Sequence, residues 1–111
     1  MKSTPYQIGY YYERRAMKYL EKEGYGSISS RGSHKIDIIA WLKTNIIECI
    51  RERPLILFVF LKKGSPRKLP KEEMDYIKRI RKETPACIQV ETWFWKEYAR
   101  EPIRFVIKDM E

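Results

Sequence analysis

The sequence has few of the residues that usually build metal centres and disulfide frameworks. It contains two cysteines, Cys49 and Cys87, and a single histidine, His34. Two isolated cysteines are too few for a zinc site, and we interpret them as small core residues of a protein in a reducing compartment. His34 falls in a predicted turn, where an exposed residue is the simplest interpretation and a phosphate contact the alternative.

Long apolar runs are also missing. The strongest run, Leu55 to Leu61, is seven residues long, whereas a membrane-spanning helix needs about 20. The first 12 residues lack the apolar core of a secretory signal. We therefore expect no membrane association and a cytoplasmic location. There is no internal repeat, low-complexity tract or linker, so residues 1–111 are expected to form a single domain with one modest core.

The sequence is rich in basic residues. It has 23 lysines and arginines against 15 acidic residues, a net charge of +8. Such an excess favours a polyanionic partner, nucleic acid before an anionic membrane. The densest stretch, residues 62–71, holds five basic residues and no acidic one: Lys62, Lys63, Arg67, Lys68 and Lys71. A run of charges is usually a solvated face, but this one follows the strongest predicted strand.

Hydrophobic periodicity predicts seven elements and a weaker apolar run at 45–51. The helices are at 6–23 and 71–82, and the strands at 27–30, 35–42, 55–61, 86–94 and 103–107. The order α-β-β-β-α-β-β predicts an α/β domain with a mixed sheet flanked by helices and strand 55–61 at its centre. In the last helix Met74, Ile77 and Ile80 should point inward. On strand 86–94 and just beyond it, Trp93 and Trp95 should share one face of the sheet and Phe94 the other, so both faces are expected to be covered.

Asp37 stands at the head of the apolar run that forms strand 35–42. Aspartate is a poor strand residue, and a carboxylate at the start of a buried strand needs a reason. One reason is Mg²⁺, which proteins hold with one or two carboxylates plus water and phosphate oxygens. The simpler alternative is a strand cap or a pair with Lys35 or Arg31.

The pattern as a whole resembles the PD-(D/E)XK nucleases, and specifically the small archaeal Holliday junction resolvases. The matching residues are Gly9 and Glu13 on the first helix, Gly24-Tyr25 after it, and the segment Ser30-Arg31-Gly32-Ser33-His34-Lys35-Ile36-Asp37. A hydrophobic strand ending in Glu-x-Lys, a basic loop, a helix and a hairpin follow in that family. The resemblance covers nearly the whole chain, and residues 30–40 are its most specific part.

The resemblance implies a restriction-endonuclease-like sheet and a Mg²⁺-dependent, structure-selective DNA endonuclease of recombination and repair. It implies catalytic roles for Glu13, Asp37 and Lys62, with Asp37 and Glu13 binding the metal. The implied DNA contacts are Arg31, Ser33, Lys35, Lys63, Arg67, Lys68 and Lys71. Resolvases are homodimers, because two symmetric nicks need two sites; this chain could form a homodimer or a heterodimer with a paralogue. Without the resemblance, Glu13 would be interpreted as a solvated helix charge.

One residue departs from the family pattern. If Lys62 matches the family's lysine, Phe60 stands where the metal-binding glutamate is expected. The other register matches Glu48-Cys49-Ile50, keeps the carboxylate and loses the lysine, but leaves strand 55–61 unexplained. We prefer the first register, because the basic loop and following helix then fall into place. It predicts weak or absent Mg²⁺ binding and impaired catalysis. The alternative function is a non-catalytic DNA-binding or partner-binding subunit on a nuclease scaffold.

Overall fold

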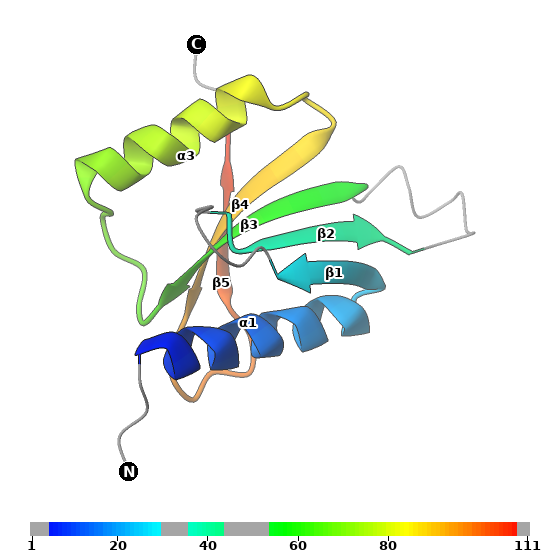
Figure 1. Cartoon of the computed structure of the whole chain (residues 1–111), viewed down its shortest axis with the longest axis vertical. Coiled ribbons are helices and arrows are strands. Elements are labelled where there is room, and N and C mark those ends of the chain that lie inside the picture. The colour runs from blue at the N-terminus through cyan, green and yellow to red at the C-terminus, as the bar shows by residue number, and fades with distance from the viewer. Residues whose placement is uncertain (1–4, 30–35, 44–53, 109–111) are drawn as a thin grey trace.

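A computed structural model describes residues 5–29, 36–43 and 54–108, the side chains of residues 5–9 excepted. Within these residues two helices, α1 (Pro5–Lys22) and α3 (Lys71–Glu83), flank a single five-stranded sheet (Figure 1). The strands are β1 (Tyr25–Ser29), β2 (Ile38–Leu42), β3 (Ile56–Lys63), β4 (Ile88–Trp95) and β5 (Ile103–Ile107). The predicted α/β class, mixed sheet and element order are therefore confirmed. The predicted apolar run at 45–51 lies outside the described residues.

The sheet runs in the order β1-β2-β3-β4-β5, with β3 in the centre as predicted. Neighbouring strands are antiparallel except β3 and β4, which are parallel and therefore need a crossover connection. That connection consists of residues 64–70 and α3. We call residues 62–71 the basic loop, counting the basic residues at the end of β3 and the start of α3 with it. The topology thus fixes the basic loop at the end of the central strand.

α1 covers one face of the sheet. Tyr12, Ala16 and Leu20 recur at the four-residue spacing of one helical face and are buried against the sheet together with Trp93 and Trp95. The sequence pattern alone places Tyr10, Glu13, Met17 and Leu20 near one face of this helix, with Ala16 beside them. The structure differs at the first of these residues, since Tyr10 is 38% exposed. The reason is that Tyr12 gives the better fit to the Ala16–Leu20 row. Gly24, with φ of 92°, follows the helix in a conformation that favours glycine.

α3 covers the opposite face (Figure 1). Ile77 is fully buried and Met74 and Ile80 pack beside it, as predicted. Their partners on the sheet include Phe60 and Phe94. Trp93 and Trp95 thus lie on the α1 face and Phe94 on the α3 face, so the expectation that both faces are covered is confirmed. Because all three rings are buried, this run offers no exposed aromatic patch to a partner.

Cys87 is exposed just before β4, so its predicted place in the core is wrong. It stands outside the strand, in the turn that follows α3. Cys49 lies outside the described residues. In the part of the chain that the structure describes, no helix is both long and apolar enough to cross a membrane.

Candidate functional site

Asp37 is fixed against the central strand. Its backbone N–H donates to the carbonyl of Val59 at 3.0 Å, and its carboxylate accepts a hydrogen bond from the backbone N–H of Leu61 at 2.7 Å. Asp37 immediately precedes β2, and β2 pairs with β3, so the sheet register places this carboxylate beside the last residues of β3. The aspartate that the sequence singled out is therefore held at the edge of the sheet where the basic loop begins.

The other two predicted catalytic residues, Glu13 and Lys62, both act on the pKa of the Asp37 carboxyl. Burial raises the pKa of the Asp37 carboxyl above its usual range, and the negative charge of Glu13 adds to the increase. The Leu61 N–H and the positive charge of Lys62 act in the opposite direction without cancelling it. Glu13, Asp37 and Lys62 come from α1, the start of β2 and the end of β3, yet their charges interact. A carboxylate kept in a place that disfavours its charge is typical of functional sites.

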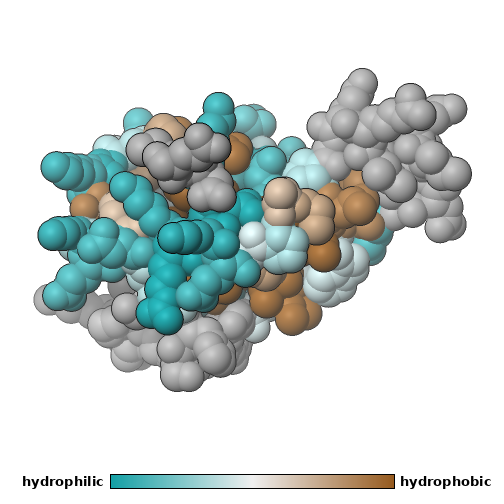
Figure 2. All heavy atoms as spheres, turned by 90° about the horizontal axis from the view of Figure 1, so that it is seen from above, coloured by the Kyte–Doolittle hydropathy of each residue, from teal (hydrophilic) through white to brown (hydrophobic). Residues whose placement is uncertain are grey.

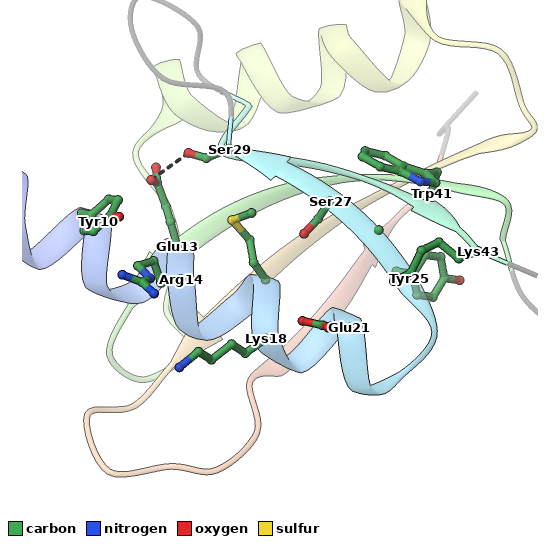
Figure 3. A pocket seen from close by; sticks show the side chains of 12 residues that line it. Tyr10, Glu13, Arg14, Lys18, Glu21, Tyr25, Ser27, Ser29, Trp41 and Lys43 are labelled. Carbon is green, nitrogen blue, oxygen red and sulfur yellow. Dashed lines mark hydrogen bonds between the residues drawn. The ribbon is translucent and has the colours of Figure 1, made fainter.

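Glu13 is not a freely solvated helix charge. One of its carboxylate oxygens, Oε2, accepts a hydrogen bond from the Ser29 hydroxyl at 2.8 Å, which ties α1 to the end of β1 (Figure 3). Both residues line an open cavity of about 620 Å³ between α1 and the β1–β2 edge, with Tyr10, Arg14 and Trp41 among its walls. Sequence reasoning missed Ser29, although a serine at the end of the first strand was a visible signal.

Lys62 forms an ion pair with Glu73, in the first turn of α3. Both side chains line a cavity of about 480 Å³ together with Asp37 and Glu72. Carboxylates in the first turn of a helix are stabilised by the helix dipole, so Glu72 and Glu73 are well placed there. The sequence analysis did not single out Glu73. The paired acids directly after Lys71 could have indicated it.

Phe60 lines the same cavity but belongs to the core. Its ring is 1% exposed and packs on the α3 face with Ile77 and Phe94. The Tyr76 ring meets it edge-on, with 6.4 Å between centroids. The position where the family's glutamate is expected thus has apolar surroundings.

The described residues do not form a closed cage for Mg²⁺. Asp37 and Glu13 each already accept one hydrogen bond, and Phe60 supplies no oxygen. Within residues 10–29, 36–43 and 54–108, no three or more histidine, cysteine or acidic side chains are grouped so that they could hold a metal. Glu48, the carboxylate of the other register, lies outside these residues.

The basic loop presents its charges to solvent. Lys63, Arg67, Lys68 and Lys71 are all exposed. Gly64 follows β3 with φ of 91°, and the Arg67 guanidinium donates to the carbonyl of Lys63 at 2.8 Å. The loop is therefore a turn that its own hydrogen bond holds, with these four cations at the surface. Figure 2 looks onto the α3 end of the molecule and shows hydrophilic side chains over much of the described surface there.

Not every basic residue of α3 adds to this surface. Lys78 and Lys82 are exposed, whereas Arg79 pairs with Glu83. Arg81 is 8% exposed, and its guanidinium donates to backbone carbonyls of residues 84, 85 and 88. The predicted DNA contacts Arg31, Ser33 and Lys35, with His34, lie outside the described residues.

Comparison with known proteins gives no further assignment: no family model matches the sequence, and no curated protein shows significant similarity to it.

Proposed function

We propose that this protein binds DNA through the basic loop and the adjoining surface of α3, on a scaffold that resembles Holliday junction resolvases and with impaired metal-dependent cleavage. The observation that carries the proposal is the position of the loop. Four exposed cations, Lys63, Arg67, Lys68 and Lys71, lie at the end of β3 and just beyond it. The last residues of this strand include Lys62 and stand beside Asp37. A phosphate backbone lying along the loop would pass that site.

The charge arrangement supports a DNA partner. The cations of a DNA-binding surface replace condensed counterions on the phosphates, and this exchange supplies much of the affinity. The exposed loop cations are not neutralised by acidic residues within the loop, which contains none. Glu72 and Glu73 follow at the start of α3, but Glu73 is paired with Lys62. The surface therefore keeps a positive field beside the candidate site.

The donor set supports impaired catalysis. A metal ion, when bound in such a site, neutralises the phosphate and lowers the pKa of the attacking water. Among the described residues, Asp37 and Glu13 are the two predicted carboxylates that could hold it, and a buried Phe60 stands at the position of the third. Two carboxylates can hold Mg²⁺ with help from phosphate, so we propose weak binding in the free protein.

An active endonuclease is the second candidate, and the raised pKa of Asp37 favours it. A protein that had lost all use for this carboxylate would gain by replacing it with a neutral side chain. The alternative to an endonuclease is a non-catalytic subunit that forms a homodimer or pairs with a paralogue. Cleavage of a four-way junction distinguishes the endonuclease from the non-catalytic subunit, because only the endonuclease produces Asp37-dependent nicks.

The DNA-binding proposal is tested with two double variants of equal charge change. Lys68→Ala with Lys71→Ala removes two exposed loop cations. Lys18→Ala with Lys22→Ala removes two exposed cations from α1, on the other face of the sheet. Binding to a labelled four-way junction is measured by fluorescence anisotropy over a salt series. Each lost phosphate contact should flatten the log–log salt slope by about 0.9. The proposal fails if both double variants bind with the same affinity and slope.

A further inference from the structure

A third cavity opens at the start of α3, on the other side from the cavity that Asp37 and Lys62 line. It measures about 790 Å³ and lies between the basic loop, α3 and strands β4 and β5. Pro70 lines the 480 Å³ cavity that also holds Asp37, while the next residue, Lys71, lines the 790 Å³ cavity. The end of the basic loop therefore borders both cavities, although Asp37 and Lys62 do not line the larger one.

The cavity has aromatic walls. Phe94 is buried beneath it, and Phe105 of the edge strand β5 is 45% exposed beside it. The two rings meet edge-on with 5.7 Å between centroids. The Arg67 guanidinium lies 5.6 Å from the centre of the Phe94 ring. The guanidinium thus lies over the buried ring, and the half-exposed Phe105 ring stands beside that pair in the same cavity. Proteins stack nucleobases on exposed aromatic rings and hold the backbone with nearby cations.

The hydroxyl of Thr92 is a polar group of this cavity that makes no hydrogen bond. Thr92 is 2% exposed and lines the cavity, and its hydroxyl has no hydrogen-bond partner among the described residues. A buried hydroxyl without a partner costs stability. An isosteric valine would remove that cost, so the hydroxyl needs a reason. A ligand whose polar edge reaches the cavity floor would supply one.

The rim is predominantly positive. Arg67, Lys68, Lys71 and Lys78 border the cavity, and Asp75 is the one acidic residue among the described residues that line it. Apolar rings below and cations above suit a ligand with a flat aromatic part and phosphate groups. A purely apolar peptide would leave the cations unused, and a fully paired duplex would keep its bases away from the rings.

We propose that this cavity takes an unpaired nucleotide of a DNA strand. The base would stack on Phe105, its polar edge or its sugar would bond the Thr92 hydroxyl, and the flanking phosphates would lie against Lys71 and Lys78. The inference rests on the proposed function, because it assigns a preference for unpaired DNA to the same basic surface. A free nucleotide shares this chemistry, and the experiment separates the two sources.

Binding of the full-length protein is measured by fluorescence anisotropy with a labelled oligothymidine of twelve nucleotides and with a duplex of twelve base pairs. Phe105→Leu keeps an apolar side chain but loses the stacking face, and Val106→Ala is the control on the same strand. Loss of one stacked base should weaken oligothymidine binding about tenfold, with less than twofold effect on the duplex. Lys78→Gln should also weaken it, whereas Lys82→Gln, one turn along α3, should not.

Thr92→Val separates a ligand contact from a structural role. The variant should unfold at the same urea concentration as wild type or at a higher one, yet bind oligothymidine more weakly.

Competition with thymidine monophosphate at equal nucleotide concentration should leave oligothymidine bound. Full displacement would assign the cavity to free nucleotides and overturn the assignment to a DNA strand. Sedimentation should show the same oligomeric state for wild type and Phe105→Leu. A dimer that this variant dissociates would make the cavity an interface between copies.

The outcomes also separate the inference from the function on which it rests. If Phe105→Leu and Thr92→Val bind oligothymidine like wild type while the Lys68 and Lys71 double variant loses DNA binding, the cavity assignment is wrong and the proposed function stands. If none of these variants changes binding to any DNA, both are wrong.

Discussion

Replacing Phe60 by glutamate restores the expected family residue, but the structure predicts that the fold will not accept it. The ring is 1% exposed and packs against the apolar face of α3. Losing its contacts should cost about as much as a Phe→Ala truncation, roughly 3–5 kcal/mol. Burying the carboxylate adds a further penalty or forces it to stay protonated. Since small domains are stable by only about 5–15 kcal/mol, Phe60→Glu should be unfolded or close to it.

The assay is urea unfolding followed by circular dichroism, with Phe60→Leu as the control. The control keeps an apolar side chain of lower volume and should lose only about 1–2 kcal/mol. Calorimetry with Mn²⁺ on any folded Phe60→Glu protein completes the test. A variant that unfolds like wild type and binds Mn²⁺ more tightly would refute the reasoning, because the position would then be an open carboxylate site rather than a core position.

Three further predictions follow from the same contacts. Asp37→Asn should be at least as stable as wild type at pH 7. The folded-state pKa of Asp37 is raised, so the wild type loses stability as the pH rises from about 3.9, the pKa in the unfolded chain, through the folded-state pKa. Urea unfolding over a pH series should show this loss in the wild type and not in the variant. Glu91→Gln should cost about 1.5–3 kcal/mol, because it weakens the charged hydrogen bonds between the buried Glu91 and the partly exposed Arg104, whereas exposed Glu97→Gln should cost little. Although burial alone would raise the pKa of Glu91, bonds from Arg104 and its other neighbours lower it, so its stabilising effect should fade in acid below about pH 4.3, the unfolded value. Calorimetry of the wild type with Mn²⁺ should show weak or no binding; tight binding that Asp37→Ala abolishes would contradict the account of the metal site.

Much of the fold followed from local patterns. The apolar run at 55–61 predicted the central strand, and the alternation around Trp93 and Phe94 predicted that the sheet is covered on both faces. The rotation of α1 about its axis could not be predicted from the sequence, because Tyr10 and Tyr12 are the same residue type. Only packing on the sheet selects Tyr12 as the buried residue. Cys87 was misplaced because the strand predicted to start at residue 86 begins only at Ile88, which leaves Cys87 in the preceding turn.

The candidate site was predictable only in part. Asp37 and Lys62 could be singled out from their positions on strands, but the register between β2 and β3 is what places them together. The partners Ser29 and Glu73 depend on how the helices approach the sheet. The same holds for the cavity between Thr92 and Phe105, since these residues meet only through the pairing of β4 and β5. Such tertiary contacts leave no local pattern in the sequence.

The most direct test of the central claim is to incubate the wild-type protein with a labelled four-way junction in Mg²⁺ and follow both complex formation and strand integrity. The account predicts a salt-sensitive complex in which the junction stays essentially uncut, and that loses affinity when Lys68 and Lys71 are replaced. Rapid nicking that disappears in Asp37→Ala would contradict the impaired site, and the absence of any complex at low salt would contradict the DNA-binding function itself.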